Sequence, residues 1–168
     1  MEIMDLKSIQ APLKERYRAQ PESAIVTLKA EGRIGEGVTC SVDTGRAMVK
    51  AGLHPATGGG LTSVCSGDML LQALVACAGV TLNAVATSLG FEVADARVLA
   101  EGDLDFRGTL AVSKEAPVGF SAIRLSFEVD SDLAPEQLAT LIRLTERYCV
   151  VLQTIKTAPA ISVTARAA

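Results

Sequence analysis

Cysteines are the residues of this chain with the most reactive side chains, and they lie at positions 40, 65, 77 and 149. Their spacing contains no C-x-x-C pair. The chain has a single histidine, His54, so a zinc site would need widely scattered ligands. Two interpretations stay open for these residues: buried cysteines that pack as small hydrophobes, or thiols that carry out redox chemistry.

Cys77 lies in the middle of a segment that is predicted to form one long helix, Asp68 to Leu89. The segment consists mostly of Leu, Ala, Val and Met and is too long for a strand. Ser66 is a predicted N-cap, Asp68 suits the positive end of the helix dipole, and Gly90 is a residue type that often ends helices. Because almost no charge follows Asp68, the helix is expected to be buried on all sides, with a sheet on one face and a second subunit on the other.

Cys149 lies in a second predicted helix, which begins near Pro135 and Glu136, residues that suit a first turn. Its apolar positions recur at helical spacing: Leu138, Leu141, Ile142, Thr145, Tyr148, Cys149 and Leu152. A disulfide between two cysteines requires Cα atoms within about 7 Å. The sequence does not give the distance between Cys77 and Cys149, so spacing alone leaves both interpretations open.

The remaining elements are predicted to be strands. Residues 1–21 are expected to form a polar N-terminal arm, and 54–63, with three consecutive glycines, a loop. Strands are predicted over 23–29, 38–42, 46–50, 91–105, 118–129 and 160–165, the early ones as an antiparallel meander. The order of strands, long buried helix, strands, helix and strand indicates an α+β fold. It also indicates one domain over 1–168.

The composition of the chain limits the classes of binding partner that we expect for it. At 168 residues the chain can bury a core, and its net charge of −3, without a Lys/Arg cluster, disfavours nucleic acid or an anionic membrane as the main partner. The N-terminal M-E-I-M-D-L-K is acidic where a secretory leader would be basic, and the apolar run 69–86 is interrupted by polar residues. We therefore expect a cytoplasmic protein, in which four cysteines do not indicate a secreted disulfide framework.

Two segments resemble the signatures of the OsmC/Ohr family. Residues 67–82, G-D-M-L-L-Q-A-L-V-A-C-A-G-V-T-L, resemble the long central helix of the family, where the peroxide-reacting cysteine comes in an Ala-Cys step. Residues 147–155, R-Y-C-V-V-L-Q-T-I, resemble its second cysteine signature. The resemblance extends over roughly residues 22 to 166 and is specific because both segments occur in the right order.

The resemblance implies a fold and a mechanism. The fold is OsmC-like, with antiparallel sheets wrapped around the long central helices of an intertwined homodimer and active sites at the subunit interface. Cys77 would attack an organic hydroperoxide and become a sulfenic acid, and Cys149 would condense with it to a disulfide. An external dithiol, typically lipoyl-linked in the peroxidase branch, would reduce this disulfide. No metal or bound cofactor is required, and the role would be antioxidant defence under oxidative stress.

The family also places an arginine, held by the acid that opens the helix, beside the thiolate, since a cation lowers a thiol pKa. Asp68 matches the acid. Arg33 is the candidate arginine, with Arg46 as the next choice. The alternative interpretation is that these arginines are ordinary solvated side chains and that Asp68 only caps the helix.

The chain departs from the peroxidase branch at two positions. Gly67 stands where that branch has its glutamate, and Val150 stands where it usually has a proline directly after the second cysteine. These departures keep a rival function open, namely a dimer that binds a small apolar ligand and has inert core cysteines. Cys65 is interpreted either as a third redox thiol or as a packed loop residue, and Cys40 as a core residue.

Overall fold

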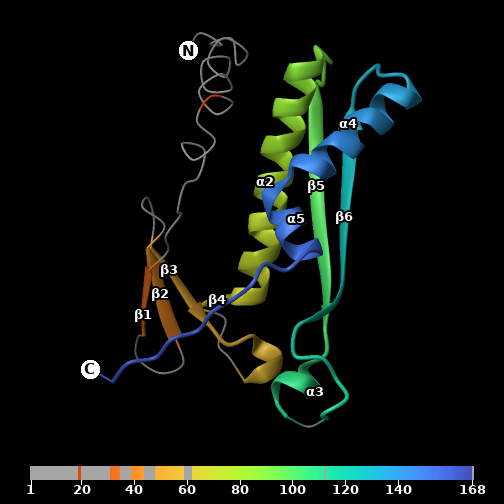
Figure 1. Cartoon of the computed structure of the whole chain (residues 1–168). Helices are drawn as coiled ribbons and strands as arrows, with labels where there is room; N and C mark the ends of the chain where they lie inside the picture. Colours follow the sequence, from red (N-terminus) through yellow and green to blue (C-terminus); the bar gives the residue numbers. More distant parts are fainter. Residues whose placement is uncertain are drawn as a thin grey trace. The chain divides into compact units, whose positions relative to one another are not determined.

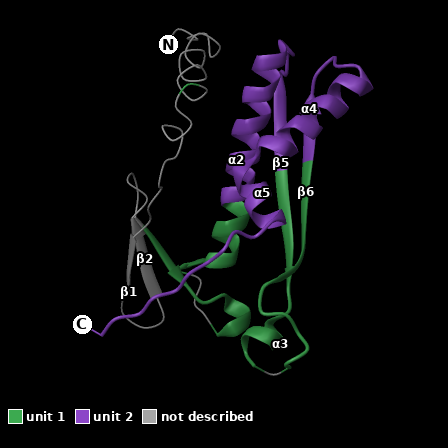
Figure 2. Ribbon diagram, in the orientation of Figure 1, with its two compact units in different colours: residues 1–72, 99–126 green, residues 73–98, 127–168 purple. Residues whose placement is uncertain are grey.

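A computed structural model of the chain describes Ala19 and residues 31–34, 39–43, 48–58, 62–111 and 113–167 (Figure 1). The predicted N-terminal arm and the predicted strand over 23–29 lie outside these residues, apart from Ala19. The chain divides into two compact units (Figure 2). Unit 1 consists of residues 1–72 and 99–126, and unit 2 of residues 73–98 and 127–168. The single domain over 1–168 stays a prediction.

Unit 1 contains a four-stranded sheet in the order β1-β2-β3-β4. The strands are β1 (Glu31–Ile34), β2 (Thr39–Asp43), β3 (Met48–Gly52) and β4 (Val64–Cys65). β1, β2 and β3 pair antiparallel, and β4 joins β3 in parallel. The antiparallel pair predicted over 38–42 and 46–50 is confirmed, with each strand shifted by one or two residues towards the C-terminus. β1 was not predicted because its glycine, and those after it, indicate turns.

The long helix α2 (Ser66–Leu89) confirms the predicted helix. It ends in a Schellman motif: Gly90 has φ +70°, the Gly90 N–H donates to Thr87 O, and the Phe91 N–H donates to Ala86 O. The fully buried residues recur every four positions and form one stripe: Leu74, Ala78, Leu82 and Ala86. Val80, outside this stripe, is 73% exposed. Within the described chain α2 is therefore covered along one side only, and burial on all sides stays a prediction for the dimer.

The predicted long strands are also confirmed, as β5 (Asp95–Leu104) and β6 (Phe120–Asp130), which form a two-stranded sheet. Arg97 lies opposite Glu128, and Asp103 opposite Ser121 and Arg124, so the strands run antiparallel. Partly buried and exposed residues alternate along both strands, as expected for a sheet with one covered face. The short helix α3 (Phe106–Thr109) lies between them in sequence.

The C-terminal part corrects two predictions. The second helix is not continuous: α4 (Pro135–Tyr148) ends before Cys149, and α5 (Val150–Lys156) begins after it. Cys149 has an extended backbone, with φ −70° and ψ 105°, and the aromatic and β-branched residues on either side of it favour helix less than Ala or Leu. The predicted strand over 160–165 is wrong as well. No strand is assigned in residues 157–167, and Ile161 and Val163 are exposed because nothing in the described chain pairs with them.

The core of unit 2 lies between α2 and α4. Leu82 and Ala86 of α2 and Leu141 of α4 are at most 3% exposed. Partly buried hydrophobic residues surround them: Val85, Phe91, Val93, Ala96, Phe127, Val129, Leu133 and Ile142. This packing joins the C-terminal part of α2 to the middle of α4 within unit 2, the unit that also contains Cys77 and Cys149.

Candidate active site

Cys77 and Cys149 lie close together within unit 2. Cys77 lies in the middle of α2 and is partly buried, and Cys149 lies in the turn between α4 and α5 and is fully buried. Both are free thiols, and they lie close enough for each to shift the pKa of the other. The structure thus brings together the two cysteines that the sequence singled out. It corrects the placement of Cys149, which lies between two helices rather than within one.

The surroundings of Cys77 shift its pKa in both directions. Burial raises the pKa of this thiol, but hydrogen bonding by the backbone N–H of Val151, the Cys149 thiol, the Thr81 hydroxyl and the backbone N–H of Val150 lowers it by more than burial raises it. The net result is a pKa below the ordinary value for cysteine. Hydrogen bonds to an ionised group favour that form, so Cys77 is the better nucleophile of the pair.

Cys149 has the opposite character. Burial raises the pKa of Cys149, and its hydrogen bond to Cys77 together with the negative charge on an ionised Cys77 raises it further; the N–H groups of Leu152 and Val151 oppose this only in part. A thiol whose pKa is raised keeps its proton and serves as a donor to the neighbouring sulfur. The pair therefore consists of one thiol that ionises readily and one that stays protonated beside it.

The turn that carries Cys149 is held by backbone hydrogen bonds on both sides. The Cys149 N–H donates to Thr145 O at 2.9 Å and ends α4, and the Gln153 N–H donates to Cys149 O at 2.9 Å and begins α5. The Thr145 side chain is fully buried, and its hydroxyl donates to Leu141 O at 2.8 Å, so it carries no unpaired polar atom into the core. The backbone N–H and C=O of Cys149 are therefore both hydrogen-bonded.

The other predicted site residues lie in unit 1. Asp68 is exposed in the first turn of α2, and Arg33 lies in β1 with its side chain outside the described part of the structure. Arg46 falls outside the described residues. The donors to Cys77 named above include none of these three. Sequence analysis missed those donors: the spacing of four residues between Cys77 and Thr81 could have suggested the hydroxyl, but no sequence signal indicates the N–H groups.

Cys65 lines a separate cavity of about 340 Å³ in unit 1. Its wall is mainly apolar, with Leu70 from α2 and Phe120 from β6. At one side the His54 ring stacks on Phe106, with ring centroids 4.9 Å apart, and His54 Nδ1 accepts a hydrogen bond from the Ala56 N–H at 3.1 Å. This cavity has the size and lining of a small-molecule pocket. Cys40 lies in β2, as predicted for a strand residue.

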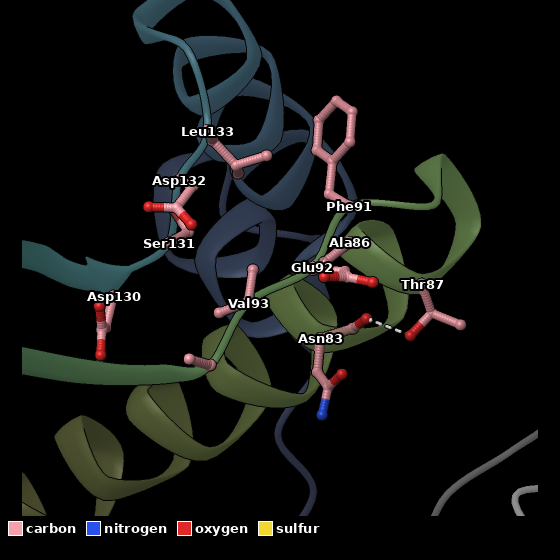
Figure 3. Close-up of a pocket in the computed structure, with 11 residues that line it drawn as sticks. Asn83, Ala86, Thr87, Phe91, Glu92, Val93, Asp130, Ser131, Asp132 and Leu133 are labelled. Carbon is pink, nitrogen blue, oxygen red and sulfur yellow. Dashed lines mark hydrogen bonds between the residues drawn. The ribbon is translucent and has the colours of Figure 1, made fainter.

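A larger cavity of about 720 Å³ lies in unit 2, where α2 ends and the chain turns from β6 towards α4. Figure 3 shows the carboxylates of Glu92, Asp130 and Asp132 among its lining residues, and the Thr87 hydroxyl bonded to Asn83 O. No cysteine lines it. Its acidic lining makes it unsuitable for a fatty-acid anion, and the chemistry of the thiol pair lies elsewhere in the unit.

Two features of the described residues bear on other kinds of site. Among the described residues, no group of three or more His, Cys, Asp or Glu side chains is placed to hold a metal ion. Of the helices described, α2 alone is long and apolar enough to cross a membrane. The core helix of a soluble protein meets the same two criteria, so this property of α2 is weak evidence for a membrane span.

The model of the family described as OsmC-like protein matches residues 58–164, more than half of the chain. No curated protein matches. Similar solved structures include an OsmC-like protein from Mycoplasma pneumoniae, at 14% identity and a TM-score of 0.67, over 79% of this chain and 89% of that one. An organic hydroperoxide resistance protein OsmC from Legionella pneumophila is 16% identical with a TM-score of 0.62, over 80% and 92%.

The organic hydroperoxide resistance protein OhrB of Bacillus subtilis is 20% identical, with a TM-score of 0.55, over 80% of this chain and 94% of that one. At these identities the solved structures show that the chain shares their α+β fold. The activities that their names state are those of the named proteins. The segment that the family model matches contains both helix α2 and the Cys149 turn. The chain therefore belongs to the OsmC-like family.

Proposed function

We propose that the protein is a cysteine-based peroxidase that reduces organic hydroperoxides. The observation that carries this proposal is the placement of Cys77 and Cys149 close enough for each thiol to shift the pKa of the other, which lowers the pKa of Cys77 and raises that of Cys149. A thiol that ionises readily beside a second thiol that keeps its proton is the arrangement a two-cysteine peroxidase needs. The names of similar structures, which include organic hydroperoxide resistance proteins, agree with this class of substrate.

The proposed first step is attack of the Cys77 thiolate on the terminal oxygen of R–O–OH. A sulfur–oxygen bond forms, the oxygen–oxygen bond breaks, and the alkoxide takes a proton to leave as the alcohol ROH. Cys77 is oxidised to a sulfenic acid. The Cys149 sulfur then attacks the Cys77 sulfur, and the departing hydroxide combines with the thiol proton to leave as water. The product of this second step is a Cys77–Cys149 disulfide.

An external dithiol completes the proposed cycle. It attacks the disulfide, passes through a mixed disulfide and becomes oxidised itself, while both protein cysteines return to thiols. No metal or bound cofactor enters these steps. Arg33, held by Asp68, remains a proposed additional activator, because a guanidinium near a thiol lowers the thiol pKa further.

The protein is proposed to act as an intertwined homodimer in the cytoplasm. Val80 of α2 is 73% exposed in the single chain, and the charged residue of this helix, Asp68, lies in its first turn. Exposed apolar surface on a long helix favours burial against a second copy.

Turnover with a dithiol tests the proposed function. Purified protein is mixed with cumene hydroperoxide and dihydrolipoamide, and loss of hydroperoxide is followed over time. We expect many equivalents to be consumed by the unaltered protein and none beyond the uncatalysed rate by Cys77→Ser. Catalytic loss of hydroperoxide that survives in Cys77→Ser would overturn the assignment of the nucleophile.

The cavity beside Cys65 favours a second candidate function, the binding of a small apolar ligand without turnover. Its volume and its apolar wall are the supporting observations. The apolar fluorescent probe N-phenyl-1-naphthylamine would then bind the Cys77→Ser protein. Binding would be lost in Leu70→Trp, which fills the cavity, and kept in Leu110→Trp, at an exposed position outside its lining. Equal binding by both tryptophan variants would remove this candidate.

A further inference from the structure

The cavity of about 340 Å³ beside Cys65 lies entirely within unit 1, and no Lys, Arg, Asp or Glu is among the described residues that line it. Its hydroxyl groups come from Thr57, Ser66 and Thr109. His54 accepts a hydrogen bond at Nδ1 from the Ala56 N–H, and an imidazole that accepts at Nδ1 is uncharged. A charged ligand would lose its hydration here without meeting an opposite charge, so the cavity favours an uncharged one.

Aromatic rings are concentrated in the wall of this cavity. Phe106 and Phe120 are two of the four phenylalanines of the chain, and the His54 ring adds a third planar surface. The His54 and Phe106 rings are stacked, with their centroids 4.9 Å apart and their planes 19° apart. Rings attract other rings through their faces and edges beyond the area that they bury. The wall therefore favours an aromatic ligand over an aliphatic one of the same size.

Both phenylalanine rings are held by the surrounding structure. Phe120 packs against the backbone of β5 at Gly102, where a Cβ would lie 2.5 Å from the ring, so glycine leaves the room that the ring needs. Phe106 begins α3, and Asp105 caps this helix by accepting a hydrogen bond from the Arg107 N–H at 3.0 Å. A wall that is already formed binds a ligand without the entropy cost of ordering side chains.

Gly67 supplies the part of the wall that comes from the first turn of α2. A Cβ at this position would lie 3.4 Å from the Phe120 ring, 3.5 Å from Leu104 Cδ1 and 3.6 Å from the Cys65 sulfur. The backbone of Gly67 is not in the left-handed region, so the conformation of the chain does not require glycine there. A side chain longer than that of alanine would displace one of these neighbours or enter the cavity. The glycine therefore keeps the cavity open.

We propose that this cavity binds one uncharged aromatic small molecule, and that Gly67 determines which ligands fit. The inference rests on the second candidate function and deepens it by naming the class of ligand. It does not depend on the thiol pair, because neither Cys77 nor Cys149 lines the cavity. Cys65 serves as a reporter for occupancy, since its sulfur lies at the wall beside Gly67 and a bound ligand would cover it.

The first test uses matched probes on the unaltered protein. N-phenyl-1-naphthylamine is uncharged, and 8-anilino-1-naphthalenesulfonate is the same molecule with a sulfonate added. In fluorescence titrations we expect the uncharged probe to bind about tenfold more tightly or better. Its displacement by 1-naphthol should need an about threefold lower concentration than displacement by decahydro-1-naphthol, which has the same skeleton without the rings' π-electrons. Equal binding of the two probes, or equal displacement by the two alcohols, would overturn the assigned class of ligand.

The second test locates the ligand. Gly67→Leu should weaken binding of N-phenyl-1-naphthylamine by about tenfold or more. The matched variant Gln72→Leu, which places the same side chain at an exposed position of α2 outside the lining, should bind as the unaltered protein does. In the unaltered protein, saturating 1-naphthol should slow alkylation of Cys65 by N-ethylmaleimide, followed by mass spectrometry of its peptide, and leave that of Cys77 unchanged. Unslowed alkylation of Cys65 would overturn the location, whether or not Gly67→Leu folds.

The possible outcomes separate this inference from the proposed functions. Binding that is lost in Leu70→Trp but kept in a folded Gly67→Leu would refute the role of Gly67 and leave the second candidate function standing. If neither probe binds, both that candidate and this inference are refuted. Binding of the uncharged probe by a protein that does not turn over hydroperoxide would refute the peroxidase function and support this inference.

Discussion

Cys77 and Cys149 lie close enough within unit 2 for each thiol to shift the pKa of the other, downwards for Cys77 and upwards for Cys149. This relationship gives the two cysteines different roles, because the Cys77 thiol ionises more readily and the Cys149 thiol keeps its proton. It also means that the second sulfur is adjacent before any oxidation takes place. Condensation of a Cys77 sulfenic acid with Cys149 therefore needs no large movement within unit 2.

The first prediction concerns pH. The pKa of Cys77 lies below its ordinary value, so its thiolate persists to lower pH than that of an ordinary cysteine, and the rate of peroxide attack falls only as pH drops through this lowered pKa. Stopped-flow measurement of the first oxidation step across pH should place the inflection below that of free cysteine measured in the same buffers. An inflection at or above the free-cysteine value would contradict the described donors.

The second prediction concerns the core that holds the two cysteines together. Leu141 is fully buried between α2 and α4, and removal of its side chain leaves a cavity. We expect Leu141→Ala to lower the free energy of unfolding by about 2–5 kcal/mol in urea denaturation. Leu110, which is 52% exposed, provides the control: Leu110→Ala should change it by about 0.5 kcal/mol or less. Equal losses in the free energy of unfolding in the two variants would show that Leu141 does not lie in the core.

The third prediction concerns the end of α2. Gly90 has φ +70°, and a Cβ there would meet nothing within 4 Å, so the cost of Gly90→Ala comes from the left-handed backbone alone. We expect a loss of about 1–2 kcal/mol in the free energy of unfolding. Gly119 is the matched control, since it too has open space around it but no positive φ. A Gly119→Ala protein as destabilised as Gly90→Ala would argue against the Schellman end of α2.

The sequence was sufficient to predict the helices and strands that have long, uniform residue patterns. The apolar run of α2, Gly90 at its end and the alternation along β6 each reflect local preferences that are strong enough to decide the structure. β1 was missed because the conformation of a glycine-containing strand is set by its partner β2 rather than by its own residues. The strand predicted over 160–165 failed for the converse reason, since alternation alone does not supply a neighbouring strand.

The candidate site was predictable in its cysteines but not in their surroundings. Helical spacing continues across Cys149, with Thr145 and Leu152 on the same stripe, so the break between α4 and α5 left no trace in the pattern. Beyond that break, the N–H groups of Val150 and Val151 contribute to the lowered pKa of Cys77. A backbone donor is the same in every residue except proline. Its use at a site can therefore be known only once the turn is seen.

The central claim is that Cys77 and Cys149 form a peroxide-driven disulfide, and mass spectrometry after one equivalent of cumene hydroperoxide tests it most directly. The account predicts a new disulfide that links the Cys77 and Cys149 peptides, and no such link in Cys77→Ser. In Cys149→Ser it predicts a Cys77 sulfenic acid that dimedone traps. Unmodified thiols at both positions after the hydroperoxide has been added would contradict the account.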